Sequence, residues 1–130
     1  MALDMFCYQC EQTVDSAGCT KHGVCGKDPE VAALQDLLTY VVKGIGMYAH
    51  RARELGASDR DIDVFIVEAL FSTLTQTNFD AERFDEFIQE AAEVRAQARK
   101  LYEQACQDAG QEPDDLGGPA ASGGDVYSRP

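Results

Sequence analysis

The stretch that decides the fold is DPEVAALQDLLTYVVKGIGMYAHRARELG, residues 28–56. Its apolar residues recur at alternating steps of three and four, which places them on one face of a single helix. Asp28 suits the N-cap of this helix, Pro29 its first position and Gly56 its end. The stripe consists of Val31, Leu34, Leu38, Val41, Ile45, Tyr48, Ala52 and Leu55. We therefore predict a long amphipathic helix with one face that other elements must cover.

Two glycines, Gly44 and Gly46, lie inside this predicted helix. Each lowers helix propensity by about 1 kcal/mol relative to alanine. Either they allow a neighbouring backbone to approach closely, or the helix simply tolerates them.

A second helix is predicted to begin at Ser58, with Asp61 at the spacing of a capping box. Its pattern fades at Asn78. The predicted buried face consists of Ile62, Phe65, Ile66, Ala69, Leu70 and Leu74.

Asp80 is predicted to cap a third helix, with Phe79 and Phe84 at the positions of a hydrophobic staple. The steps between its apolar residues again alternate between three and four. This stripe consists of Phe84, Phe87, Ala91, Val94, Ala98, Leu101 and Ala105.

The connections between these helices are only a few residues long, and short connections place consecutive helices antiparallel. We therefore expect an all-α fold, an up-down-up three-helix bundle over residues 28–108. Residues 1–27 show no helical or strand period and are expected to form a cysteine-rich, cluster-binding loop. Residues 109–130 are rich in Gly, Pro, Asp and Ser, and we expect a disordered tail or linker.

Composition narrows the class of protein. A chain of 130 residues fits one domain. Its net charge of −12 repels phosphate backbones, so we expect no nucleic-acid binding and a redox partner with a basic face. The longest apolar stretch, residues 37–48, is too short and too interrupted to span a bilayer. Met1–Met5 shows no features of a secretory signal, so we expect a cytoplasmic protein whose thiols stay reduced.

Four of the five cysteines lie in the first 25 residues, with the spacing C-x2-C-x8-C-x5-C. These are Cys7, Cys10, Cys19 and Cys25. In a reducing compartment such a group is more typical of metal ligands than of disulfides.

Three kinds of site compete for these cysteines. A structural zinc site usually has two short-spaced ligand pairs, and only Cys7 and Cys10 form one. A thioredoxin-like dithiol would need a helix starting at Cys10, which residues 11–27 do not predict. An iron–sulfur cluster takes four thiolates and tolerates irregular spacing, and glycines between its ligands let backbone N–H groups approach sulfur. The iron–sulfur interpretation is favoured, and zinc remains an alternative.

The remaining candidate ligands are weaker. Cys106, at the end of the third predicted helix, is expected to be a small buried apolar residue. His50 is expected at the surface or its boundary. His22 lies between two of the clustered cysteines, as either a solvated loop residue or a hydrogen-bonding neighbour of the metal centre.

The segments that carry these features resemble a known family, the hybrid-cluster proteins, also called prismane proteins or hydroxylamine reductases. The similar stretches are MFCYQCEQT (5–13), GCTKHGVCGK (18–27), LQDLL (34–38), KGI (43–45) and ALFSTLTQTNFDAERF (69–84). The resemblance covers roughly residues 5–105.

This resemblance implies that Cys7, Cys10, Cys19 and Cys25 hold a [4Fe–4S] cluster, because their spacing is similar to that of family members with this cluster. Members with wider spacing carry [2Fe–2S]. It also implies an oxidoreductase in which this cluster relays electrons to a buried hybrid cluster that reduces hydroxylamine or nitric oxide. The hybrid-cluster ligands of the family come from later domains, and no residue of this chain matches their context. No catalytic residue is therefore assigned.

Two functional hypotheses follow. The first is an iron–sulfur electron-transfer domain, either a fragment or a free-standing unit, whose partners include the missing hybrid-cluster domains. The second is an interaction module in which zinc or a redox-silent cluster only stabilises residues 1–27. Whether the chain is itself an enzyme stays open at this stage.

Overall fold

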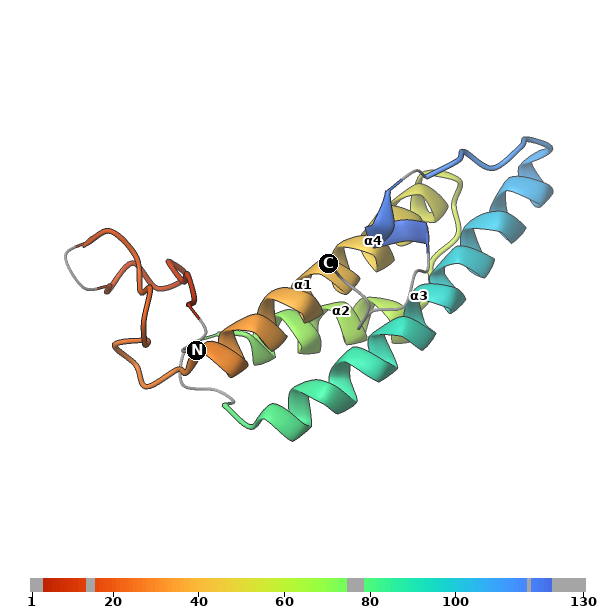
Figure 1. The fold of residues 1–130 in the computed structure, drawn as a ribbon. Coiled ribbons are helices and arrows are strands. Elements are labelled where there is room, and N and C mark those ends of the chain that lie inside the picture. The colour runs from red at the N-terminus through yellow and green to blue at the C-terminus, as the bar shows by residue number, and fades with distance from the viewer. Residues whose placement is uncertain (1–3, 14–15, 75–78, 117, 123–130) are drawn as a thin grey trace.

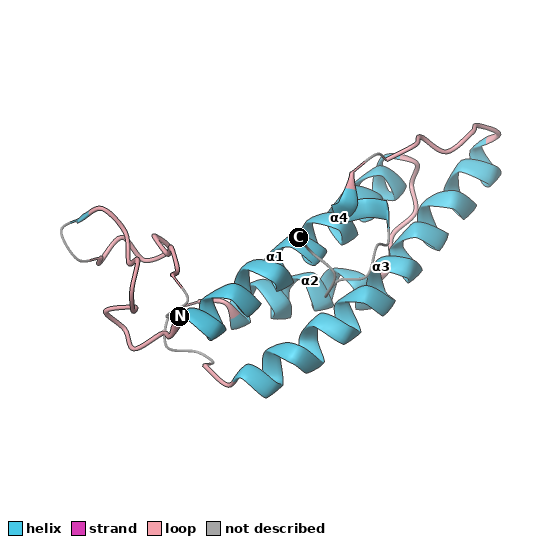
Figure 2. Ribbon diagram, in the orientation of Figure 1, coloured by secondary structure: helices cyan, strands magenta, loops and turns pink. Residues whose placement is uncertain are grey.

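The computed structural model describes residues 4–13, 16–74, 79–116 and 118–122. Figure 1 and Figure 2 show an N-terminal loop region followed by three long helices that run up, down and up, with a short fourth helix packed against the first. The predicted all-α three-helix bundle is confirmed. The helices are α1 (Pro29–Glu54), α2 (Arg60–Ser72), α3 (Ala81–Ala109) and α4 (Pro119–Ser122).

Both ends of α1 form as the sequence predicts. The Asp28 carboxylate accepts a hydrogen bond of 2.8 Å from the backbone N–H of Val31, which satisfies a donor left open in the first turn. At the other end Gly56 has a φ of 84°, in the left-handed region that glycine enters without strain. The N–H groups of Gly56 and Ala57 then donate to the carbonyls of Arg53 and Ala52, each at 2.9 Å. This pair of bonds is a Schellman motif and closes the helix.

The core lies mainly between α1 and α3, which pack along most of their length. The stripes predicted for these two helices face each other there, and the rings of Tyr48 and Tyr102 meet at a centroid distance of 6.2 Å. The largest side chains that are almost fully buried are Leu38, Val41, Ile45, Ile62, Phe84, Ile88 and Cys106. Burial of these groups is the main stabilising term for the bundle.

Helix α2 differs in detail from the prediction. Its N-cap is Asp59, whose carboxylate accepts the N–H of Asp61 at 2.9 Å, so the expected Ser58 capping box was wrong by one residue. Within the predicted buried face, Ile62, Phe65 and Ala69 are buried, whereas Leu70 and Leu74 are exposed. The helix ends at Ser72, and the predicted end near Asn78 falls outside the described residues.

The C-terminal segment also differs from the expected disordered tail. The carbonyl of Ala120 accepts a hydrogen bond of 3.1 Å from Arg95, and that of Ala121 accepts one of 2.8 Å from Tyr48. The N–H of Asp114 donates to the Tyr102 hydroxyl at 2.9 Å. The segment is therefore held to the bundle by hydrogen bonds and by two small buried alanines. Its polar composition gives no indication of these contacts. The tail beyond residue 122 lies outside the described residues.

Gly44 explains how α4 comes so close to α1. A Cβ at this position would overlap the carbonyl group of Ala120, so only glycine leaves room for that backbone. Gly46 faces open space, where nothing lies within 4 Å of an added Cβ. Of the two alternatives raised for these glycines, close approach therefore applies to Gly44, whereas Gly46 is tolerated. Among the described residues, no helix is both long and apolar enough to cross a membrane.

We predict opposite effects on stability from alanine at the two glycines. Gly44→Ala should lower the free energy of unfolding by about 1–3 kcal/mol, because backbone must shift to relieve the overlap. Gly46→Ala, the matched control, should raise it by up to about 1 kcal/mol through helix propensity alone. Urea unfolding followed by circular dichroism measures both. A change of the same sign in both variants would contradict the assigned packing of α4.

Candidate metal centre

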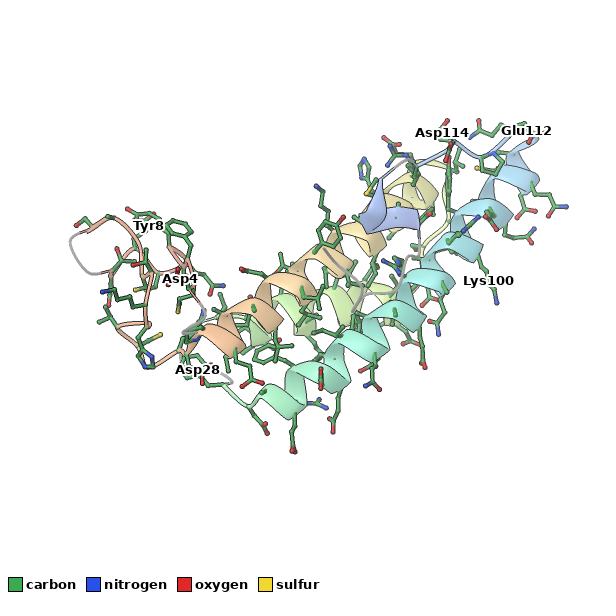
Figure 3. The ribbon with its side chains drawn as sticks, viewed as in Figure 1. Asp4, Tyr8, Asp28, Lys100, Glu112 and Asp114 are labelled. Carbon is green, nitrogen blue, oxygen red and sulfur yellow. The ribbon has the colours of Figure 1, made fainter. Side chains whose placement is uncertain are left out.

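The four clustered cysteines lie in a loop region at one end of the bundle, beside the start of α1 and at the far end from α4 (Figure 1). Figure 3 shows this region with Asp4 and Tyr8 on the loop and Asp28 where the loop joins α1. All four thiols are free of disulfide bonds. Cys10 is exposed, Cys7 and Cys25 are half-buried and Cys19 is buried. The loop therefore presents four sulfurs at graded depths from solvent.

Backbone pairing brings two of these cysteines directly opposite each other. The N–H of Cys7 donates to the carbonyl of Cys19 at 2.9 Å, and the N–H of Cys19 donates back at 2.8 Å. Beside this isolated antiparallel bridge, the N–H of Met5 donates to the carbonyl of Thr20 at 3.0 Å. Residues paired in this way have their Cα atoms about 5.5 Å apart and their side chains on the same side. Cys7 and Cys19 are thus held as neighbours by the backbone alone.

Three of the four cysteines have a neighbouring residue with a positive φ angle, where the chain turns sharply. Positive φ angles occur at Glu11 (59°), Gly18 (118°) and Gly26 (98°), each next to one of the four cysteines. Glycine adopts this region without strain, whereas Glu11 is a non-glycine residue there. Such left-handed residues reverse the chain locally, and they cluster at ligand-binding sites in proteins. The chain therefore reverses direction beside Cys10, Cys19 and Cys25.

A small apolar cluster fastens the loop to α1. Met5, Cys19 and Ala32 are buried together, and Cys7 packs against them. This cluster is separate from the main core. Because Ala32 belongs to the first turn of α1, the loop is attached to the bundle at the same place where the chain enters the helix.

Sequence reasoning missed three residues that support the loop. Lys27 is buried, and its ammonium lies 3.5 Å from the Cys7 sulfur and 3.4 Å from the Gln9 side-chain oxygen. Gln9 in turn donates to the Thr73 hydroxyl, just past the end of α2, at 3.2 Å. No local pattern marks these residues, because the Gln9–Thr73 contact spans 64 positions of sequence.

The remaining candidate ligands lie either away from the cysteine loop or exposed on its surface. Cys106 is fully buried in the main core, as expected for a small apolar residue. The side chain of His50 is 71% exposed and lies 3.5 Å from Glu54 on the outside of α1, which confirms the expected surface position. His22 is exposed. Phe6 and Tyr8, on either side of Cys7, are 62% and 44% exposed.

The donor set of the loop fits an iron–sulfur group. Such groups take four cysteine thiolates, and the loop offers four free thiols within 19 residues of sequence, from Cys7 to Cys25. In the described part of the chain, no three Cys, His, Asp or Glu side chains converge at the spacing of a single metal ion.

The fold and the loop together define an all-α protein with four free cysteines in a loop at one end of a helical bundle. Residues 5–120 match the sequence model of the Prismane/CO dehydrogenase family. The chain belongs to this family, which confirms the resemblance noted in the sequence and implies iron–sulfur binding.

Curated relatives agree with this assignment. The chain is 52% identical over 120 residues to the hydroxylamine reductase of Acidithiobacillus ferrooxidans, covering 89% of this chain and 22% of that protein. It is 52% identical over 103 residues to that of Thermotoga maritima, covering 79% and 24%. It is 46% identical over 121 residues to that of Geobacter sulfurreducens, covering 92% and 22%. The chain therefore spans about a fifth to a quarter of the length of these relatives.

We predict that Cys19→Ser abolishes stable cluster binding, because it removes a buried ligand held opposite Cys7. The bundle should stay helical, since its core is separate. The matched control is Cys106→Ser, which should lower the free energy of unfolding by about 1–3 kcal/mol through a buried hydroxyl and leave the iron content unchanged. Iron analysis measures cluster binding, and circular dichroism measures the helical content and stability of each variant. Full iron content in Cys19→Ser would refute this ligand assignment.

Proposed function

We propose that this chain is the electron-transfer domain of a hydroxylamine reductase-like protein, with a [4Fe–4S] cluster on Cys7, Cys10, Cys19 and Cys25. The observation that carries the proposal is the loop itself, with four free thiols and a backbone pair that sets two of them face to face. When bound, the cluster would supply one-electron redox chemistry. Five free cysteines also suit a cytoplasmic protein, where thiols stay reduced.

In this proposal the residues of the chain bind the cluster and limit its contact with water. Cys19 would hold it from the buried side, and Cys10 from the exposed side. A partly exposed centre suits electron exchange with another protein, because the donor must approach it. Reduction of hydroxylamine would then take place in a part of the longer hydroxylamine reductase-like protein that this chain does not match.

Anaerobic reconstitution with iron and sulfide tests this function. We expect about four irons and four sulfides per chain, as a cubane with four thiolate ligands requires. Reduction with dithionite should produce the electron paramagnetic resonance signal of a reduced cubane. A colourless protein that takes up one zinc ion and shows no such signal would contradict the proposal and favour a structural module.

We also propose a redox partner with a basic docking face. The net charge of −12 supports it, as do the exposed carboxylates of Asp4 and Asp28 on and beside the cysteine loop (Figure 3). Glu11 of the same loop is also exposed. Complementary charge raises the rate at which such partners meet.

A second surface supports association with the rest of a longer protein. Helix α2 buries Ile62, Phe65 and Ala69 against the bundle, but Val64 and Val67 are 42% and 68% exposed on its other side. Leu70 and Phe71 continue this outer apolar face at 41% and 60% exposure. A helix that is apolar on both sides is typical of one buried in a larger protein. We propose that the remaining four-fifths of a hydroxylamine reductase-like polypeptide cover this face.

The double substitution Val64→Ser and Val67→Ser tests the outer face of α2. Binding to the separately produced remainder of the Acidithiobacillus ferrooxidans relative should weaken at least tenfold, because burial of a valine contributes about 1.5–3 kcal/mol. Isothermal titration calorimetry measures the affinity.

The matched control replaces two exposed polar residues on α3, Gln97→Ser and Lys100→Ser, and should bind like the wild type. The free energy of unfolding of the valine variant should stay within about 0.5 kcal/mol of wild type. Unchanged affinity in the valine variant, or equal weakening in both, would refute this surface.

A further inference from the structure

We propose that Lys27 is a buried cation that hydrogen-bonds the Cys7 sulfur and raises the reduction potential of the metal centre. This role rests on the proposed function, because it needs a redox-active centre on the cysteine loop. Lys27 touches no substrate. It is a positioning residue that acts through Cys7, and it lies outside the four-cysteine ligand set.

Burial is the first observation. Lys27 is only 3% exposed, although lysine is almost never fully buried unless its charge is paired. The described residues give its ammonium two polar contacts, to the Cys7 sulfur at 3.5 Å and to the Gln9 oxygen at 3.4 Å. Neither contact is to a carboxylate. A sulfur that becomes a thiolate ligand is therefore the negative group that this buried charge faces.

The backbone holds Lys27 in this place. The N–H of Gly23 donates to the Lys27 carbonyl at 2.7 Å, and the N–H of Gly26 donates to the Gly23 carbonyl at 2.9 Å. A Cβ at Gly23 would come within 2.9 Å of the Lys27 Cβ, so only glycine fits there. Asp28, the next residue, is tied to α1 as its N-cap. The position of Lys27 is thus set by a tight turn on one side and a helix cap on the other.

A chain of hydrogen bonds also connects the Lys27 ammonium to the end of α2. Gln9 accepts from Lys27 through its oxygen and donates through its nitrogen to the Thr73 hydroxyl, which itself donates to the Leu70 carbonyl at 2.7 Å. A cavity of about 280 Å³ borders Cys7, Gln9, Lys27 and Thr73. Gln35 lines it as well, and its buried amide nitrogen has no hydrogen-bond partner among the described residues. This side of Cys7 is therefore rich in buried donors.

The sign of the effect follows from charge. When the centre gains one electron from a donor, no bond forms or breaks, Lys27 keeps its proton, and the centre becomes one unit more negative. A fixed positive charge next to a ligand sulfur stabilises that reduced form more than the oxidised form. Removal of the charge should therefore make reduction harder. Because Lys27 is buried, solvent and salt screen this interaction only weakly.

The test uses the full chain with its cluster reconstituted, and the readout is the reduction potential from a redox titration followed by electron paramagnetic resonance. Lys27→Met should shift the equilibrium between oxidised and reduced forms at least tenfold toward the oxidised form, which is about 59 mV for a one-electron couple. Lys27→Arg keeps the charge and should change the equilibrium less than threefold. Lys21→Met, which removes an exposed charge from the same loop, is the matched control and should also change it less than threefold.

The outcomes separate the two proposals. No four-iron cluster in the wild type would overturn the proposed function and this role with it. A wild-type cluster with equal potentials in Lys27→Met and Lys21→Met would overturn the role of Lys27 alone. If Lys27→Met fails to hold a cluster, Lys27→Gln replaces it, since glutamine keeps a donor and loses the charge. A lower potential in Lys27→Gln than in Lys27→Arg supports the proposal, and equal potentials in these two variants refute it.

Discussion

The rest of the structure depends on the burial of one apolar stripe of α1. This helix packs against α2, α3 and α4, and its first turn also carries the cysteine loop. Leu38, Val41 and Ile45 are fully buried along it. Apolar burial scales with the area removed from water, so a helix that packs against all three of the others contributes strongly to the fold. The loop has only a small apolar cluster of its own and depends on this scaffold.

The cysteine loop is attached to the scaffold at two helix ends. Met5 and Cys19 pack on Ala32 at the start of α1, and Gln9 bonds to Thr73 just past the end of α2. These two attachments come from helices that run in opposite directions, so their ends meet at the same end of the bundle (Figure 1). Loops carried by a rigid scaffold are where proteins place binding groups. The up-down order of the bundle is therefore what positions the cysteine loop.

Much of the fold could be predicted from local pattern. The stripes of α1 and α3 are buried as their periodicity indicates, and Asp28, Gly56 and Asp80 act at the helix ends where they were expected. The prediction failed for the outer part of α2. Its apolar residues lie on both sides, and periodicity alone does not say which side a small bundle covers. Leu70 and Leu74 are consequently exposed.

The sequence by itself determined the helices, their antiparallel order and the set of four cysteines, because caps and periodic stripes are local properties of the chain. Tertiary structure alone decided the docking of α4, where Tyr48 bonds to Ala121 across 73 positions. It also decided that Cys7 and Cys19 pair through the backbone and that Lys27 is buried against Cys7. These contacts depend on how distant segments come together in space. A lysine between a glycine and a helix cap carries no local sign of its burial.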